Sequence, residues 1–255
     1  MRRTLTPQDL WKIPRVGQPA PAPDGSFVVV PVTTYDLDKN KGTTRLYRVA
    51  NGRVDPLTAS DRSSTAPVIS PDGARMAFLR DVDELPQLHV MHLGGGEAEL
   101  LTNMPLGVAG LKWLPDGSGL IFLAPLFKEA LDVEATRRLV ASRREDPVKV
   151  HVTEDRVFRY WDRWLTDGKV PHVFRLDLTS GETTCLTPGS TRWWNWETPG
   201  DNFDVAPDGR EIAFSADTSE PPHDQPSFAV FTVPVEGGVV TCLTPDGSGH
   251  ERRPR

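Results

Sequence analysis

The apolar residues of this chain recur in short strands that each follow the same turn. The turn is Pro-Asp-Gly, and in the four places where such a strand follows it, its proline stands at residues 23, 71, 115 and 207. After each turn, three consecutive apolar residues occupy equivalent positions: Val28, Val29 and Val30; Met76, Ala77 and Phe78; Leu120, Ile121 and Phe122; Ile212, Ala213 and Phe214. A strand that is apolar on both faces belongs inside a stack of sheets.

A second motif, Leu-Thr, recurs once in each unit that contains a Pro-Asp-Gly turn and its apolar strand. Leu-Thr ends a strand at 57–58, 101–102, 186–187 and 243–244, each time after a polar or glycine-containing turn. The turn chemistry is consistent, because proline presets φ, aspartate bonds the nearby backbone and glycine accepts a positive φ. Each unit therefore predicts four strands joined by short turns.

Four-stranded units that repeat about every 45 residues are typical of a β-propeller. The predicted fold is all-β, a β-propeller spanning 1–255 with about four four-stranded blades, forming an incomplete ring. The spacing of Leu-Thr to the next Pro-Asp-Gly predicts that the last residues begin a further blade. The expected boundaries are 16–58, 64–102, 108–187 and 201–244 for the four blades, and 245–255 for the start of the next.

The third unit is stretched by an insertion at 126–170. Leu131, Ala135 and Leu139 recur at four-residue spacing, which predicts a helix over 128–145. Its two Arg-Arg pairs, 137–138 and 143–144, are interpreted as a solvated helix face rather than an anion site.

Composition narrows the function classes. The chain has 255 residues, Lys+Arg 29, Asp+Glu 35 and a net charge of −6. This charge lacks the basic footprint of a nucleic-acid binder. No apolar run approaches the roughly 20 residues of a membrane span. The first residues lack the apolar core of a secretory signal, so we expect a cytoplasmic chain with neither nucleic acid nor a membrane as partner.

The few cysteines and histidines do not form a recognisable cofactor site. Cys185 and Cys242 occupy the same position in adjacent units, too far apart for a disulfide, and are predicted to be small buried hydrophobes. His89 and His92 are three residues apart on a predicted strand and so point to opposite faces. We expect no metal and no cofactor.

Three segments of the sequence resemble segments of known protein families. Ser70-Pro71-Asp72-Gly73-Ala74-Arg75-Met76-Ala77-Phe78 resembles the TolB-like propeller repeat. The opening 5–10, running into 21–25, is similar to the start of prolyl oligopeptidase family serine peptidases. The insertion's tail resembles a stretch of the acylaminoacyl-peptidase-like branch: Arg159-Tyr160-Trp161-Asp162-Arg163-Trp164, then Asp167-Gly168-Lys169 and His172-Val173-Phe174.

The resemblance implies a propeller that precedes an α/β-hydrolase domain, covers its active site and filters short peptide substrates by size. The chain departs from the family at one decisive point. It contains no Gly-x-Ser-x-Gly nucleophile elbow, and Gly117-Ser118-Gly119 and Gly247-Ser248-Gly249 are turns of the repeat. We therefore expect no catalytic residue here and an α/β-hydrolase domain C-terminal to this chain as partner.

Two aromatic segments are candidates for the wall of a substrate chamber, with Glu197 offering a charge to a peptide amine. The candidate residues are Tyr160, Trp161, Asp162, Arg163, Trp193, Trp194, Trp196 and Glu197. The structural alternative is a tryptophan cluster packed on the propeller face or against the hydrolase domain, and an Asp162–Arg163 ion pair that holds the insertion.

Two other interpretations of the function of this chain remain open. A non-catalytic TolB-like propeller would act as a protein-interaction module. A sugar-acting propeller enzyme would need convergent carboxylates, and no such pair is identified in the sequence.

Overall fold

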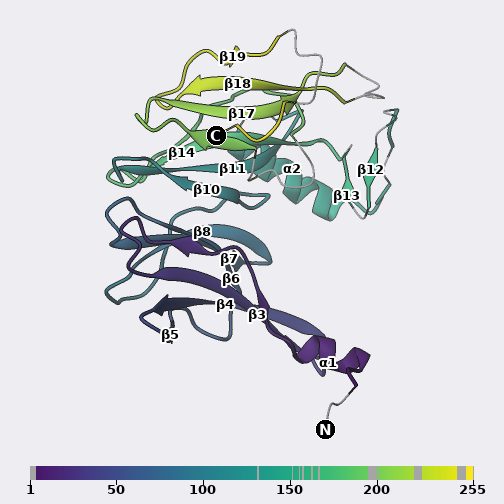
Figure 1. Ribbon diagram of the computed structural model, residues 1–255. Helices are drawn as coiled ribbons and strands as arrows, with labels where there is room; N and C mark the ends of the chain where they lie inside the picture. The colour runs from purple at the N-terminus through teal and green to yellow at the C-terminus, as the bar shows by residue number, and fades with distance from the viewer. Residues whose placement is uncertain are drawn as a thin grey trace. The chain divides into compact units, whose positions relative to one another are not determined.

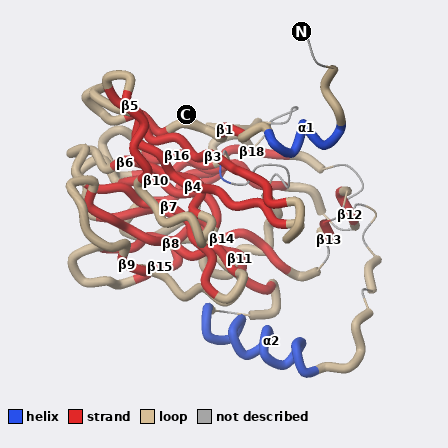
Figure 2. Tube along the Cα trace, turned by 90° about the horizontal axis from the view of Figure 1, so that it is seen from below, coloured by secondary structure: helices blue, strands red, loops and turns tan. Residues whose placement is uncertain are grey.

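The computed structural model describes most of the chain as two compact units, Met1–Thr102 and Asn103–Arg255. The described residues are 4–130, 132–150, 152–154, 156, 158–161, 163–165, 167–194, 200, 202–220, 226–245 and 251–254. Each unit holds two antiparallel meanders of strands (Figures 1 and 2).

Unit 1 begins with a short helix and continues as two sheets. Its elements are α1 (Pro7–Lys12), β1 (Arg15–Val16), β2 (Ala20–Pro21), β3 (Val28–Asp36), β4 (Lys41–Ala50), β5 (Arg53–Pro56), β6 (Ser64–Ile69), β7 (Arg75–Val82), β8 (Leu85–His92) and β9 (Glu99–Leu100). The sheets are ordered β1-β3-β4-β5 and β6-β7-β8-β9. The first strand of the first sheet is divided, because β1 and β2 both pair with β3.

Unit 2 holds two further four-stranded sheets and the insertion. Its elements are β10 (Ala109–Trp113), β11 (Gly119–Phe127), α2 (Val133–Glu145), β12 (Arg159–Tyr160), β13 (Arg163–Trp164), β14 (Lys169–Asp177), β15 (Thr183–Cys185), β16 (Phe203–Val205), β17 (Glu211–Asp217), β18 (Phe228–Pro234) and β19 (Thr241–Cys242). The large sheets are ordered β10-β11-β14-β15 and β16-β17-β18-β19, and β12 pairs with β13 in a separate hairpin. The predicted four-stranded units, with a helical insertion in the third, are confirmed.

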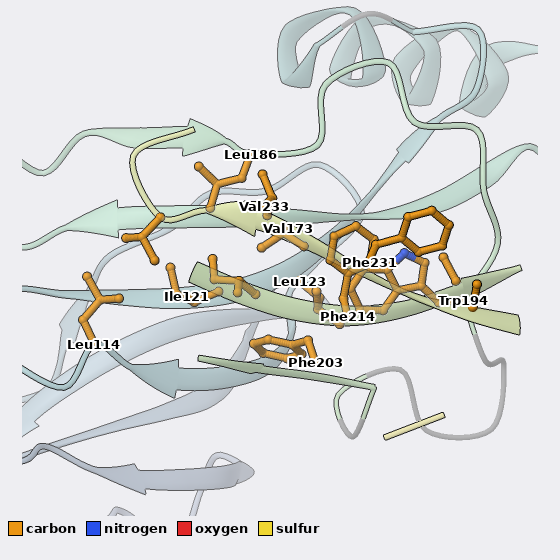
Figure 3. Packing of buried hydrophobic residues seen from close by; sticks show 14 residues of the cluster. Leu114, Ile121, Leu123, Val173, Leu186, Trp194, Phe203, Phe214, Phe231 and Val233 are labelled. Atoms are coloured by element: carbon orange, nitrogen blue, oxygen red, sulfur yellow. The ribbon is translucent and has the colours of Figure 1, made fainter. Parts of the chain in front are cut away.

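Neighbouring sheets of each unit pack through the strands that follow Pro-Asp-Gly. In unit 1, Val29 of β3 shares a buried cluster with Met76 and Phe78 of β7. In unit 2, Ile121 of β11 shares a cluster with Phe214 of β17, and Figure 3 shows the side chains interdigitating. The middle residue of one strand thus packs against the flanking residues of the next, which is why both faces of the strand must be apolar.

The Pro-Asp-Gly turns at 23–25, 71–73, 115–117 and 207–209 have one geometry. In each, the glycine N–H donates to the carbonyl three residues earlier, at 2.8 to 3.0 Å, and the glycine φ is between +70° and +72°. The aspartate Oδ1 accepts a backbone N–H two residues later. Hydrogen bonds from the Ser26 hydroxyl and N–H lower the pKa of Asp24, and those from the Ser118 N–H and hydroxyl lower the pKa of Asp116.

The Leu-Thr signature also has a structural reason. In every sheet the threonine hydroxyl accepts the backbone N–H of a residue in the third strand, at 2.9 to 3.1 Å: Leu46 to Thr58, Leu88 to Thr102, Val173 to Thr187 and Val230 to Thr244. The preceding leucine N–H donates to the carbonyl of that same residue. The hydroxyl thus supplies the acceptor that the backbone no longer provides once the fourth strand ends.

We expect Thr187→Val to lower the free energy of unfolding by about 1–2 kcal/mol, because it leaves the buried N–H of Val173 without its acceptor. Thr187→Ser keeps the hydroxyl and is expected to cost less than about 1 kcal/mol, for the lost methyl group. Urea unfolding followed by circular dichroism measures both variants. Equal losses for valine and serine would show that the hydroxyl contributes nothing.

The insertion differs in detail from its sequence-based prediction. Strands β11 and β14 pair as far as Phe127 opposite Lys169, slightly inside the range 126–170 that was expected for the insertion. Helix α2 begins at Val133 instead of residue 128, because the Asp132 side chain caps it by accepting the Ala135 N–H at 2.6 Å.

Candidate functional site

Three connecting segments of unit 2 meet at one edge of its sheets. Strand β11 ends opposite the start of β14, and β17 ends at Asp217 opposite Phe228, the start of β18. Segment 186–194 reaches this edge as well, since the Trp193 carbonyl accepts the Asp217 N–H at 2.6 Å. The Lys128 Nζ, just past β11, lies 4.9 Å from the centre of the Trp193 ring. We call the edge formed by Lys128, Trp193 and Asp217 the loop edge.

Arg143 of α2 joins the two ends of the insertion. Its guanidinium forms an ion pair with Glu129, donates to the Asp167 carbonyl at 3.1 Å and lies 4.0 Å from the centre of the Phe127 ring. Arg137 makes a second anchor by donating to the Asn103 carbonyl at 2.7 Å. Arg138, Arg143 and Arg144 are exposed and Arg137 is half-exposed, as expected for a solvated helix face, although Arg137 and Arg143 also make these contacts.

The β12–β13 hairpin carries the first group of candidate residues. Tyr160 pairs with Arg163 in backbone register, and Trp161 follows β12 in the turn with a φ of +52°. The Trp161 side chain is 83 % exposed, so this hairpin presents an aromatic ring to solvent. Asp162 lies outside the described residues, and so does the ion pair expected between Asp162 and Arg163.

Neighbours of the candidate residues stiffen this hairpin. The Arg159 guanidinium donates to the Trp161 carbonyl at 2.8 Å and lies 5.3 Å from the centre of the Trp164 ring. Phe158 contacts Trp164 with ring centres 6.1 Å apart.

The second group of candidate residues, in the segment 193–197, has one tryptophan in the core and one at the loop edge. Trp194 is 3 % exposed and stacks on Phe214 with ring centres 5.0 Å apart and planes 3° apart, as Figure 3 shows. Trp193 is also buried, but its ring is covered by the ammonium group of Lys128. Trp196 and Glu197 lie outside the described residues. For Trp193 and Trp194 the positions are those of the structural alternative, a tryptophan cluster packed on the sheets.

Asp217 ties the loop edge together. Its buried carboxylate accepts the N–H groups of Ser219 and Ser227 at 3.0 Å and the Ser219 hydroxyl at 2.7 Å, which fixes both ends of the loop between β17 and β18. Its backbone carbonyl accepts from the Arg192 guanidinium at 3.2 Å. One residue therefore positions both the loop and the segment that carries the tryptophans.

A cavity of about 350 Å³ lies at the opposite edge of unit 2, beside two Pro-Asp-Gly turns. Its charged lining consists of Asp116, Asp208, Glu236 and Arg175. Arg175 of β14 forms an ion pair with Glu236, beyond the end of β18, and so joins the two sheets across the cavity. The Arg175–Glu236 ion pair thus links the two sheets, and we assign this cavity no functional role.

A cysteine and a histidine lie close together in unit 2, but they cannot act as a nucleophile and base. The Cys185 Sγ is 3.9 Å from the His172 Nδ1, which also lies 2.7 Å from the Thr187 carbonyl. A carbonyl only accepts hydrogen bonds, so Nδ1 carries the proton and cannot take another from the thiol. Burial raises the pKa of Cys185 and lowers that of His172. Both cysteines are free and half-buried, less enclosed than predicted.

The described residues contain no group of three or more histidine, cysteine, aspartate or glutamate side chains that could hold a metal. His89 is buried and His92 is exposed, as expected for opposite faces of β8. No helix among the described residues is long and apolar enough to span a membrane.

Three residues were not predicted from the sequence: Lys128 and Asp217 of the loop edge, and Arg192, which donates to the Asp217 carbonyl. The only available signal was the adjacency of Arg192 to the tryptophans. Lys128 and Asp217 reach the edge because strands far apart in the sequence end at the same place, which no local pattern reveals.

Comparisons with known proteins place the chain among peptidase relatives. It is 30 % identical over 235 residues to the uncharacterized peptidase YuxL of Bacillus subtilis, covering 88 % of this chain and 34 % of that protein. It is 28 % identical over 220 residues to dipeptidyl-peptidase 5 of Porphyromonas endodontalis, covering 83 % and 30 %. The chain thus spans about a third of the length of these curated relatives. No family model matches the sequence.

Solved structures show the same fold. The acylaminoacyl peptidase of Pyrococcus horikoshii matches 92 % of this chain and 33 % of its own, with a TM-score of 0.64 and 16 % identity. A putative TolB from Agrobacterium tumefaciens matches 92 % and 64 %, at 0.55 and 20 %. The β-propeller domain of the Trilobed protease from Pyrococcus furiosus matches 91 % and 57 %, at 0.54 and 15 %.

The four meanders are therefore blades of a TolB-like β-propeller. Within that class, the chain corresponds to the propeller portion of proteins named as peptidases, as the resemblance in sequence implied.

Proposed function

We propose that this chain is the substrate-gating, non-catalytic propeller of a prolyl oligopeptidase family serine peptidase that cleaves short peptides. A serine hydroxyl in an α/β-hydrolase domain C-terminal to this chain attacks the peptide carbonyl, the C–N bond breaks, and the amine leaves with the serine's proton. Water then hydrolyses the acyl-enzyme. The supporting observation is that peptidase relatives match the chain over only a third of their length, while the match covers most of the chain.

The loop edge and the β12–β13 hairpin are the parts of the propeller that we assign to gating. Tyr160, Trp161, Asp162 and Arg163 would line the path of the peptide. Trp193 and Trp194 would support that path from within the sheets, and Trp196 and Glu197 would extend it. An insertion of this kind suits the role, because Arg143 holds its two ends together while the Trp161 side chain is exposed to solvent.

The test begins with the reading frame beyond Arg255 and continues with the whole protein it encodes. We expect a Gly-x-Ser-x-Gly motif followed by aspartate and histidine, and hydrolysis of chromogenic short peptides. Replacing 128–168 by a short turn between Phe127 and Lys169 should raise the rate on 20-residue peptides relative to dipeptides by about tenfold. A reading frame without a hydrolase contradicts the proposal, and an unchanged length preference contradicts the gating role.

The second candidate is a non-catalytic interaction module. It is favoured by the TolB likeness, in which the chain covers 64 % of the solved protein, about twice the share it covers in the acylaminoacyl peptidase. Further propeller repeats followed by a stop codon would select it.

A further inference from the structure

The second sheet of unit 1, β6-β7-β8-β9, departs from the repeat at three positions on adjacent strands. It has Ser64, Arg80 and His89 where the repeat places aliphatic residues, aromatic residues or glycine. The equivalent residues of the other sheets are Val16, Val108 and Gly200 for Ser64, Val32, Ala124 and Ala216 for Arg80, and Tyr47, Phe174 and Phe231 for His89. Since the other sheets stack without these polar groups, stacking does not explain why they are present.

The three side chains form one group together with Phe78. The Arg80 Nε donates to the Ser64 hydroxyl at 3.2 Å, and the guanidinium carbon lies 5.0 Å from the centre of the Phe78 ring. Phe78 stacks on His89 with ring centres 5.6 Å apart and planes 25° apart. Ser64, Phe78 and His89 are buried, whereas Arg80 is half-buried. Arg80 is therefore held at one edge of its guanidinium group by a rigid base.

Arg62 brings a second positive charge to the same place. It lies two residues before Ser64, which pairs with Arg80 in the sheet, and it is exposed. Burial lowers the pKa of Arg80 and the charge of Arg62 lowers it further, so the two guanidinium groups lie within electrostatic reach of each other. The exposed Asp61 raises the pKa of Arg80, but this is the smaller of the two charge effects.

The carboxylates of unit 1 leave both arginines unneutralised. The structure describes every residue from 4 to 102, so all of the carboxylates of this unit are included. Among the described residues, the terminal nitrogens of Arg80 donate no hydrogen bond, and neither Arg80 nor Arg62 forms an ion pair. A half-buried charge without a partner costs free energy. A ligand that carries a negative charge would offset this cost.

From this arrangement we infer that Arg62 and Arg80 form a binding site for a carboxylate group of a peptide. A guanidinium group suits a carboxylate because it can donate two parallel hydrogen bonds to it. Arg80 is already held by Ser64 and Phe78, so it loses less entropy on binding than a free side chain would. The inference rests on the proposed function for its ligand, a short peptide, and adds a preference for peptides with a carboxylate.

The first measurement is direct binding to the complete 255-residue chain by calorimetry, which requires no hydrolysis. The probes are three N-acetylated tripeptides: a neutral amide with glutamine in the middle, the same amide with glutamate instead, and the glutamine peptide with a free C-terminus. We expect at least one of the two carboxylate peptides to bind about tenfold tighter than the neutral amide. Whichever of them binds tighter identifies the source of the carboxylate. Raising the salt from about 50 to about 500 mM should remove most of this preference.

Variants separate the charge from the fold. Arg80→Ala introduces the residue that two other sheets have at this position, so the sheet should still form, and the carboxylate preference should fall about fivefold. Arg62→Gln should lower the preference about threefold, and the double variant should abolish it. The matched control is Arg53→Gln in β5, an exposed arginine of the same unit, which should leave the preference unchanged.

His89 provides a readout that a purely structural role of the arginines would not change. Burial lowers the pKa of His89, and the positive charges of Arg80 and Arg62 lower it further. The Gln87 carbonyl, which accepts a hydrogen bond from the imidazole at 3.1 Å, raises it. A carboxylate bound to the two arginines offsets their charge. The pKa of His89, followed by NMR, should therefore rise with the tighter-binding peptide and stay the same with the neutral amide.

Equal affinity for the three peptides would overturn the inference, and so would a loss of preference in Arg53→Gln as large as in the double variant. A pKa of His89 that does not respond to the tighter-binding peptide would place the carboxylate elsewhere and would also overturn it. In the whole protein, the double variant should raise KM for the preferred peptide about tenfold and leave KM for the neutral amide unchanged. A protein that hydrolyses no peptide contradicts the proposed function, while the binding ratio still decides the carboxylate site.

Discussion

Phe214→Ala is expected to lower the free energy of unfolding of unit 2 by about 3–5 kcal/mol, the range for a fully buried aromatic residue. Phe214 is 3 % exposed and stacks on both Trp194 and Phe231, with ring centres 5.0 and 5.6 Å away. Its removal leaves a cavity between the two sheets of the unit and breaks both ring contacts. Urea unfolding followed by tryptophan fluorescence measures the loss, since Trp194 reports directly on this cluster.

The matched control is Phe158→Ala in the insertion. Phe158 is 43 % exposed and contacts only one aromatic ring, so we expect a loss below about 1 kcal/mol. If Phe214→Ala costs no more than Phe158→Ala, the two sheets are not held together by this cluster. Such a result would also remove the physical basis for the repeated pattern of apolar residues.

The blades could be predicted from the sequence because each is specified by local chemistry. Pro-Asp-Gly closes its own turn through the glycine N–H and the aspartate Oδ1, and Leu-Thr bonds to the strand beside it. Neither motif depends on residues far away in the chain. The apolar triplets then follow from stacking, because a strand covered on both sides has no place for a polar residue.

The candidate site could be predicted only in part, because its contacts join residues that are far apart in the sequence. Trp161 was selected from the sequence because it belongs to the aromatic segment 159–164, and the structure shows its side chain exposed. The anchoring by Arg143 and the network of Asp217 join segments separated by 24 and 25 residues, and no periodic pattern marks such contacts. From the sequence, the arginines of the insertion were predicted only as solvated side chains. The hydrogen bonds by which Arg137 and Arg143 hold the insertion in place could not be predicted.

Gly110 within β10 shows that a single glycine can indicate a local irregularity that the repeat pattern does not predict. Gly110 lies at a register shift between Ala109 and Leu111, with a φ of +63°. A Cβ added there would lie 2.8 Å from the Gly200 Cα and 2.9 Å from the Phe203 Cε1. Glycine inside a strand indicates a bulge or a close approach of backbone, and here it indicates both.

Gly110→Ala is accordingly expected to lower the free energy of unfolding by about 3–4 kcal/mol, combining the cost of a left-handed alanine with that of an overpacked contact. The φ alone is tolerable, because Ala66, at the equivalent position of the second sheet, has a φ of +49°. The contact with Gly200 is what the second sheet lacks, and backbone cannot move aside as a flexible side chain can. Chemical denaturation and thermal melting measure the loss.

Gly181→Ala provides the control that isolates this contact. Gly181 has a φ of +73°, and its added Cβ would meet nothing within 4 Å, so only the backbone cost of about 1–2 kcal/mol is expected. The difference between the two variants therefore measures the approach of segment 200–203 to β10. Equal losses would mean that this approach is loose enough to admit a methyl group. In either case Trp193 keeps its hydrogen bond from the Asp217 N–H, and Trp194 keeps its stacking on Phe214.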